Sequence, residues 1–151
     1  FLPQADLVNA ARNTFNFYNS KTDYQKSCTI SVIDCSYMDE IAEFAREAYT
    51  TAKPLSVDAD IQKYTLDNPC YYYDFMDYVG AISGESSAYN NLCLSMDDAI
   101  EYKANTESIW GLLKIKRHSG LSTYIPRNKE DNPYGYKELA WWRDVAHVLQ
   151  N

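Results

Sequence analysis

The sequence predicts one layered α/β domain, and three features of the chain carry that prediction. A helical hydrophobic pattern occupies residues 3 to 20, and the β-branched apolar run CTISVIDC follows at 28 to 35. A second helical pattern begins directly after that run, and three short β-like segments come later, between residues 99 and 126. Strand, tight turn and helix in this order are typical of folds in which helices cover a sheet.

The first half of the chain is expected to place a buried strand between two helices. Pro3 is tolerated in the first turn of the first helix. The run from 28 to 35 has the composition of a strand that is buried on both faces. Ser36, with Asp39 three residues later, resembles a capping box, and Pro54 ends the helix that would follow. That helix is expected to bury six side chains: Met38, Ile41, Ala42, Ala45, Ala48 and Tyr49.

The second half is expected to alternate helices with short strands. Residues 55 to 68 could hold one helical turn, and helices are expected over 73 to 83, closed by Gly84, and over 86 to 99. The segments AIEYKA, WGLLKIK and LSTYIP then read as strands, separated by turn-forming NTES and HSG. A last helix is expected over 135 to 149.

Composition and charge restrict the class of partner. Hydrophobic residues are 46% of the chain, and no repeat or linker divides it, so residues 1 to 151 are expected to form a single structural unit. The net charge of −7 argues against nucleic acid, because phosphates are bound mainly by Lys and Arg. No apolar run approaches the ~18 residues of a transmembrane segment. The chain shows no signal peptide and no initiator Met, which suggests a mature, processed or truncated piece.

The four cysteines show no zinc-binding pattern. Cys28, Cys35, Cys70 and Cys93 form no C-x-x-C pair and have no nearby histidine at zinc spacing. The chain also lacks a G-x-G-x-x-G motif and a P-loop, so neither a metal nor a cofactor is expected. Buried free thiols and one or two disulfides both remain compatible with the sequence.

Cys35 and His118 are the residues in which a cysteine-peptidase site would first be sought. Such a pair needs the imidazole within hydrogen-bond reach of the sulfur. Cys35 ends a hydrophobic run and fits a buried, inert thiol, whereas His118, in RHSG, fits a solvated or carbonyl-bonded histidine. His147 is expected to be a charge on the last helix. The pair is therefore not predicted to be catalytic.

Two pairs of acids and a group of aromatics are the other candidate functional residues. Asp74 with Asp77, and Asp97 with Asp98, resemble glycosidase carboxylates only in type, and fit solvated helix faces better. The sequence thus predicts no catalytic, cofactor-binding or metal-binding residue. The chain has 14 tyrosines, and YYYDF at 71 to 75 could either fill the core or form an interface.

Five segments in order carry a family resemblance: SCTISVIDCSYMDEIAEFA, YYYDFMDYVGAIS, AIEYKANTE, HSGLSTYIPRN and YKELAWWRDVAHV. They resemble the C-terminal portion of clostripain-like cysteine peptidases, relatives of gingipains and caspases. That family has an SxIDLS strand before a helix, a YYDLxDF segment, an SGLSIYFP strand and an aromatic-rich YxxLxWYxDxxW helix. Cys35 departs from the pattern, since it stands where leucine is usual, and His147 falls near the expected late aromatic.

The resemblance implies the C-terminal part of a caspase-like layered α/β fold, with helices packed on a short mixed sheet. In the family, a His-Gly motif and then an Asp-x-Cys motif supply the catalytic pair, upstream of the segments matched here. In this chain Cys35 precedes His118, Asp34 is adjacent to the cysteine, and a serine follows the histidine. The resemblance therefore transfers no catalytic residue to this chain.

The function implied by the resemblance is that of a non-catalytic part of an endopeptidase that cleaves after Arg or Lys. This part would complete the sheet and line the substrate cleft. Its expected partners are the N-terminal catalytic portion and a peptide or protein substrate, and its expected location is secreted or associated with a bacterial cell envelope. Two alternatives are a module that binds protein or glycan through a Tyr/Trp surface, and a homologue that has lost the chemistry.

Overall fold

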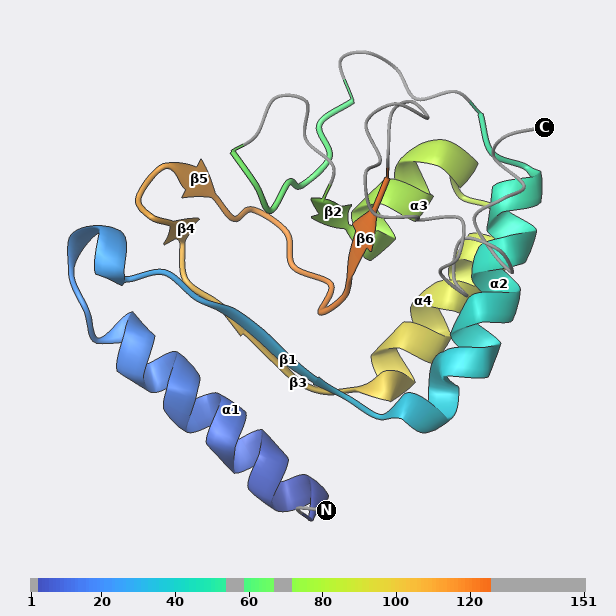
Figure 1. Ribbon diagram of the computed structural model, residues 1–151. Helices are drawn as coiled ribbons and strands as arrows, with labels where there is room; N and C mark the ends of the chain where they lie inside the picture. The colour runs from blue at the N-terminus through green and yellow to red at the C-terminus, as the bar shows by residue number, and fades with distance from the viewer. Residues whose placement is uncertain (1–2, 54–58, 67–71, 126–151) are drawn as a thin grey trace, which may run out of the picture.

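The computed structural model describes residues 3–53, 59–66 and 72–125, which form a mixed α/β arrangement (Figure 1). The helices in these residues are α1 (Gln4–Asn19), α2 (Met38–Thr50), α3 (Phe75–Ser83) and α4 (Ser87–Ala99). The strands are β1 (Thr29–Ile33), β2 (Tyr72–Asp74), β3 (Ile100–Asn105), β4 (Ser108–Ile109), β5 (Leu113–Lys114) and β6 (Ser122–Tyr124). The α/β class and the positions of all four helices are confirmed.

The strands differ from the predicted short mixed sheet. Within the described residues they form three separate two-stranded ladders, β1–β3, β2–β6 and β4–β5, and each ladder is antiparallel. The reason is the path of the chain after α4, since β3 returns to β1, β4 and β5 pair with each other, and β6 pairs with β2.

The β1–β3 ribbon lies between α1 and the rest of the protein (Figure 1). On one face, the Arg12 guanidinium of α1 lies 5.4 Å from the centre of the Tyr102 ring of β3. On the other face, the Ser31 hydroxyl donates to the carbonyl of Gly120 at 2.6 Å. All residues of β1 are only half-buried, because a two-stranded ribbon covers little of each face. The expected burial on both faces is therefore wrong.

The start of α2 also differs from the prediction. Ser36 does not cap α2, whose first residue follows Tyr37 without a side-chain cap; Asp34 instead caps the preceding 3₁₀ turn by accepting from the Ser36 N–H at 2.9 Å. A 3₁₀ turn at Cys35–Tyr37 then leads into the helix at Met38. The expected apolar face is confirmed at four of six positions, which are fully buried: Ile41, Ala45, Ala48 and Tyr49.

The core lies where α2, α3 and α4 meet. Ser86 caps α4 by accepting from the Tyr89 N–H at 3.1 Å, and Leu92 and Met96 of α4 are among the most buried side chains. The Ser95 hydroxyl donates to Glu40 of α2 at 2.6 Å, which fixes the two helices side by side. The helix expected from residue 73 begins only at Phe75, because Tyr72–Asp74 pairs with β6.

Of the three late segments, AIEYKA forms β3 at the expected length, whereas the other two form shorter strands than expected. WGLLKIK does not form one strand, since Trp110 and Gly111 lie in the turn between β4 and β5. Residues 59–66 contain no helical turn, and the helix expected over 135–149 lies outside the described residues. Gly84, with φ of 62°, follows α3 as predicted. No helix within the described ranges is long and apolar enough to cross a bilayer.

Candidate functional site

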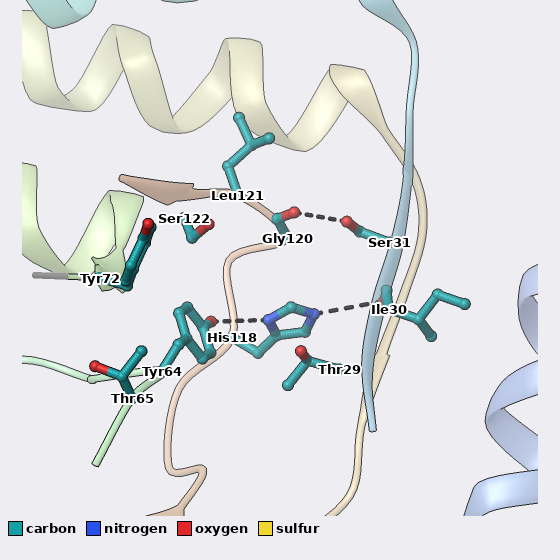
Figure 2. Close-up of a pocket in the computed structure, with 10 residues that line it drawn as sticks. All are labelled: Thr29, Ile30, Ser31, Tyr64, Thr65, Tyr72, His118, Gly120, Leu121 and Ser122. Carbon is teal, nitrogen blue, oxygen red and sulfur yellow. Dashed lines mark hydrogen bonds between the residues drawn. The ribbon is translucent and has the colours of Figure 1, made fainter. Parts of the chain in front are cut away.

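A pocket of about 300 Å³ lies on the face of β1 that α1 does not cover (Figure 2). Thr29 to Ser31 of β1 form one wall, and Tyr64 and Tyr72 form the opposite wall with Thr65. His118 and the segment from Gly120 to Ser122 close it. Hydroxyl groups and one imidazole dominate the lining, so the pocket offers many hydrogen bonds and no fixed charge.

His118 is held in place through both ring nitrogens (Figure 2). Its Nδ1 lies 2.9 Å from the hydroxyl of Tyr64, and its Nε2 lies 3.4 Å from the carbonyl oxygen of Ile30. The ring also meets the Tyr64 ring edge to face, with centroids 6.0 Å apart. The expectation of a carbonyl-bonded histidine is therefore confirmed.

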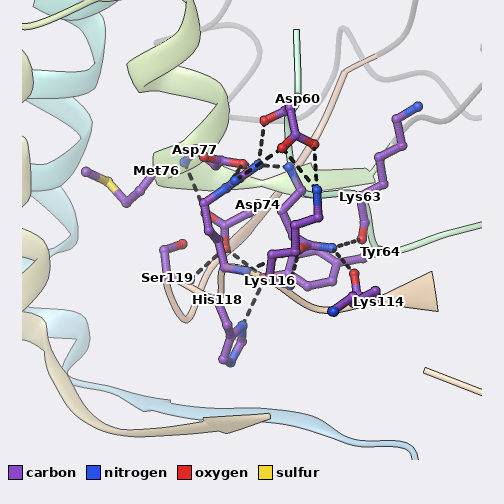
Figure 3. Close-up of polar contacts among 12 residues, drawn as sticks. Asp60, Lys63, Tyr64, Asp74, Met76, Asp77, Lys114, Lys116, His118 and Ser119 are labelled. Atoms are coloured by element: carbon purple, nitrogen blue, oxygen red, sulfur yellow. Dashed lines mark hydrogen bonds and ion pairs between the residues drawn. The ribbon is translucent and has the colours of Figure 1, made fainter. Parts of the chain in front are cut away.

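Asp74 is the centre of the polar network beneath the pocket (Figure 3). Its carboxylate is 1% exposed and accepts three bonds: from the Tyr64 hydroxyl at 2.7 Å, the Ser119 N–H at 2.7 Å and the Asp77 N–H at 3.0 Å. The Tyr64 oxygen also lies 2.9 Å from Nδ1 of His118, so Tyr64 links the carboxylate to the imidazole. The three side chains thus form a continuous polar chain that holds the histidine ring in place.

Gln62 and Asp77 anchor the segment that carries His118. The side-chain amide oxygen of Gln62 accepts from the backbone N–H groups of Lys116 at 2.7 Å and Arg117 at 3.2 Å. The Asp77 carboxylate accepts from the Arg117 guanidinium at 2.8 Å and the Gln62 N–H at 2.6 Å. Lys116 pairs with Asp60 at 3.2 Å. Two cations of the basic cluster at 114–118, Lys116 and Arg117, thus form ion pairs with acids of the same chain.

Burial sets the charge state of the pocket. Desolvation by burial lowers the pKa of His118; the Ile30 carbonyl and Asp74 oppose it with smaller upward effects, and Lys103 adds the smallest effect, which is downward. Burial and the bond to Asp74 raise the pKa of Tyr64 well above its usual range. Near neutral pH both side chains are therefore uncharged, and they can form hydrogen bonds with a ligand as neutral groups.

His118→Asn is expected to flatten the dependence of stability on pH. The pKa of His118 is lower in the folded chain than in the unfolded chain, so the unfolded state takes up the proton first. Wild-type stability is thus lost as pH falls below the ordinary histidine pKa of about 6.5. Urea unfolding at neutral and mildly acidic pH should show the stability advantage of the wild type shrinking as pH falls. An advantage that grows on acidification would contradict this assignment.

Cys35 does not pair with His118 in the structure. Its side chain is exposed, and its Sγ lies 4.0 Å from the carbonyl oxygen of Ile33, whereas both nitrogens of the histidine contact other residues. The expectation of a buried thiol at this position is wrong, because the 3₁₀ turn carries Cys35 out of the strand. Cys28 and Cys93 are half-buried free thiols, and Cys70 lies outside the described residues.

The other residues considered from sequence have mixed outcomes. Asp97 and Asp98 are exposed, as expected, but Asp74 is buried and Asp77 is partly buried, so the prediction of a solvated face is wrong for that pair. Trp141, Trp142 and His147 lie outside the described residues. YYYDF contributes buried Tyr73 and Phe75 to the core. In the described part of the chain, no three His, Cys, Asp or Glu side chains gather as metal ligands would.

The structure resembles solved C11 cysteine proteases. An inactive zymogen C11 protease from Parabacteroides distasonis superposes with a TM-score of 0.75 and 30% sequence identity, covering 93% of this chain and 43% of that chain. A clostripain from Bacteroides thetaiotaomicron, in complex with a peptide inhibitor, superposes with a TM-score of 0.74 and 19% sequence identity, covering 91% of this chain and 62% of that chain. A secreted C11 cysteine protease from the same species also has a TM-score of 0.74 and 19% identity, covering 91% of this chain and 40% of that chain.

These likenesses extend over most of this chain, which spans less than two thirds of each of the three proteases. No protein-family model matches the chain, and no curated protein sequence matches it either. The chain is therefore related in structure to clostripain-like C11 cysteine proteases, with four helices and small antiparallel sheets in its described residues.

Proposed function

We propose that the chain is the non-catalytic C-terminal part of a clostripain-like cysteine endopeptidase whose complete form cleaves after Arg or Lys. The observation that carries this proposal is the likeness of 93% of this chain to a C11 protease of which it spans only 43%. The five ordered motifs resemble those of the family's C-terminal portion and support this placement. The occupied nitrogens of His118 and the exposed position of Cys35 support placing the catalytic pair upstream.

The outer edge of β1 supports a role in completing a sheet. Thr106 donates its N–H to Cys28, and since ladder bonds alternate in antiparallel pairs, Thr29 and Ser31 direct their backbone groups away from β3. Within the described residues β1 pairs with β3 alone. An unpaired edge is a template for a further strand. The upstream catalytic portion is the partner that we propose for it, and a secreted or envelope location follows the secreted C11 protease.

The substrate of the complete enzyme is proposed to be a peptide or protein with Lys or Arg before the cleaved bond. The B. thetaiotaomicron clostripain was solved with the inhibitor BTN-VLTK-AOMK, whose peptide ends in lysine. This chain would contribute one wall of the cleft, and its own acidic balance, a net charge of −7, favours cationic substrates.

The chain alone is expected not to hydrolyse a fluorogenic peptide that ends in VLTK. A cysteine nucleophile needs a base beside it, and His118 is bound to Tyr64 and Ile30 instead. The assay compares the wild type, Cys35→Ala and buffer, and all three should give the same background rate. Turnover that Cys35→Ala abolishes would overturn the proposal. A parent gene that encodes His-Gly and then Asp-x-Cys ahead of Phe1 would support it.

A binding module is the second candidate function, and one observation favours it. Large aromatic side chains, among them Tyr24 and Trp110, remain exposed in the described structure. A parent gene without the two upstream motifs would favour this candidate over the peptidase.

A further inference from the structure

A second pocket, of about 550 Å³, lies where α1 ends and the β4–β5 turn approaches it. Four aromatic side chains line it: Phe17, Tyr18, Tyr24 and Trp110. They come from the last turn of α1, the connector to β1 and the tip of the hairpin. Tyr24 is 65% exposed and Trp110 is 53% exposed, so their rings face solvent instead of filling the core. The peptidase assignment gives this aromatic pocket no role.

The backbone is strained at Trp110 and directly before Tyr24. Trp110 has φ of 53° and Asp23, which precedes Tyr24, has φ of 54°, and these are the non-glycine residues with positive φ in the described chain. Such conformations cost free energy, and observed outliers of this kind gather at ligand sites. The Trp110 N–H donates to the Ser27 hydroxyl at 3.1 Å, which ties the hairpin tip to the connector.

The remaining lining residues are polar and decide the class of ligand. They are Lys21, Gln25 and Ser27, and the Lys21 ammonium lies 4.0 Å from the centre of the Phe17 ring. None of the described lining residues is aliphatic and none is acidic. The pocket thus lacks the aliphatic wall that an apolar peptide anchor needs and the carboxylate that a cationic side chain needs.

Aromatic faces with a rim of hydrogen-bond donors match a pyranose ring. The face of an aromatic ring carries negative partial charge. The axial C–H bonds of a sugar carry positive partial charge and lie flat against such a face, while its hydroxyl groups at the ring edge reach the amine, amide and hydroxyl of the rim. The volume falls in the range of small-ligand pockets.

We propose that this aromatic pocket binds a neutral carbohydrate, with Trp110 and Tyr24 as the stacking surfaces and Lys21 and Gln25 as hydrogen-bond donors. The proposal does not depend on the peptidase assignment. A peptidase part with this pocket would hold a glycan attached to its substrate or to the cell surface.

Isothermal titration calorimetry, in which maltohexaose, cellohexaose or xylohexaose is added to the full chain, tests the proposal. At least one of them is expected to bind, and Trp110→Ala is expected to weaken that binding about tenfold or more, as loss of one stacking surface would. Leu112→Ala is the matched control, because Leu112 lies in the same hairpin, is 75% exposed and does not line the pocket. It should bind like the wild type. Circular dichroism checks that both variants fold.

Three outcomes would overturn the proposal. The first is the absence of heat with all three oligosaccharides up to about 10 mM, well beyond the weakest useful affinities. The second is equal binding by the wild type and Trp110→Ala. The third is a sedimentation experiment in which Trp110→Ala turns an oligomer into a monomer while no sugar binds, since the pocket would then be an interface between copies of the chain. Failure here leaves the peptide-hydrolysis result unaffected, so the two proposals can fail separately.

Discussion

Asp74→Ala is expected to lower the free energy of unfolding by about 3–5 kcal/mol, because it leaves buried donors without their charged acceptor. The carboxylate is 1% exposed and receives the Tyr64 hydroxyl, the Ser119 N–H and the Asp77 N–H. It therefore caps α3 and also joins three segments that are distant in sequence. Chemical denaturation of the wild type and the variant measures the loss.

Asp98→Ala provides the matched control, since Asp98 is an exposed acid on α4. Its effect should stay within about 0.5 kcal/mol. Tyr64→Phe then separates capping from the pocket network, because it removes one donor to Asp74 and leaves the cap bond from Asp77 intact. The double variant should show coupling between the two sites. Equal losses for Asp74→Ala and Asp98→Ala would mean that the network contributes nothing to stability.

The helices could be predicted because their signals are local. The apolar face of α2 repeats at helical spacing, and four of its six expected positions are buried. Gly84 and Ser86 mark the end of α3 and the cap of α4 within one or two residues of the bounds in the structure. Each signal acts through contacts three or four residues apart, which the sequence displays directly.

The pocket could not be predicted, because its contacts are long-range. Tyr64 meets Asp74 across 10 positions, Ser119 meets Asp74 across 45, and Tyr64 meets His118 across 54. No periodic pattern links such positions. The sequence favours a solvated face for Asp74, because acids on helices usually face water, and its role as an N-cap below the pocket reverses that expectation.

Gly120 has the positive φ expected of a turn glycine, but its surroundings are not those of a hairpin. The φ of 103° confirms one part of the prediction for HSG. The flanking strands β5 and β6 pair with β4 and β2 instead of with each other, and Gly120 lies against Ile100 and Ser31. A Cβ there would meet the side chains of Ile100 and Ser31 at 3.4–3.5 Å. The glycine is needed for a positive φ at a close crossing of two segments, and that crossing forms the wall of the pocket.

Leu92→Ala is expected to cost about 3–5 kcal/mol of stability, in the range of buried leucine truncations. Leu92 is 0% exposed and belongs to the core that α2, α3 and α4 share. Removing its side chain loses both the free energy of burial and the contacts of the cavity lining. Since α4 leads directly into β3, a weakened α4 also loosens the ribbon that forms one wall of the pocket.

Leu94→Ala is the matched control on the same helix. It makes the same change in helix propensity as Leu92→Ala but leaves no cavity in the core. Leu94 is 66% exposed, and the same substitution should change the free energy of unfolding by less than about 0.5 kcal/mol. Thermal and urea unfolding of the three proteins give the comparison. Similar losses in both variants would show that the α2–α4 contact is not the stabilising core. The role of α4 as the support that carries β3 against β1 would then have to be abandoned.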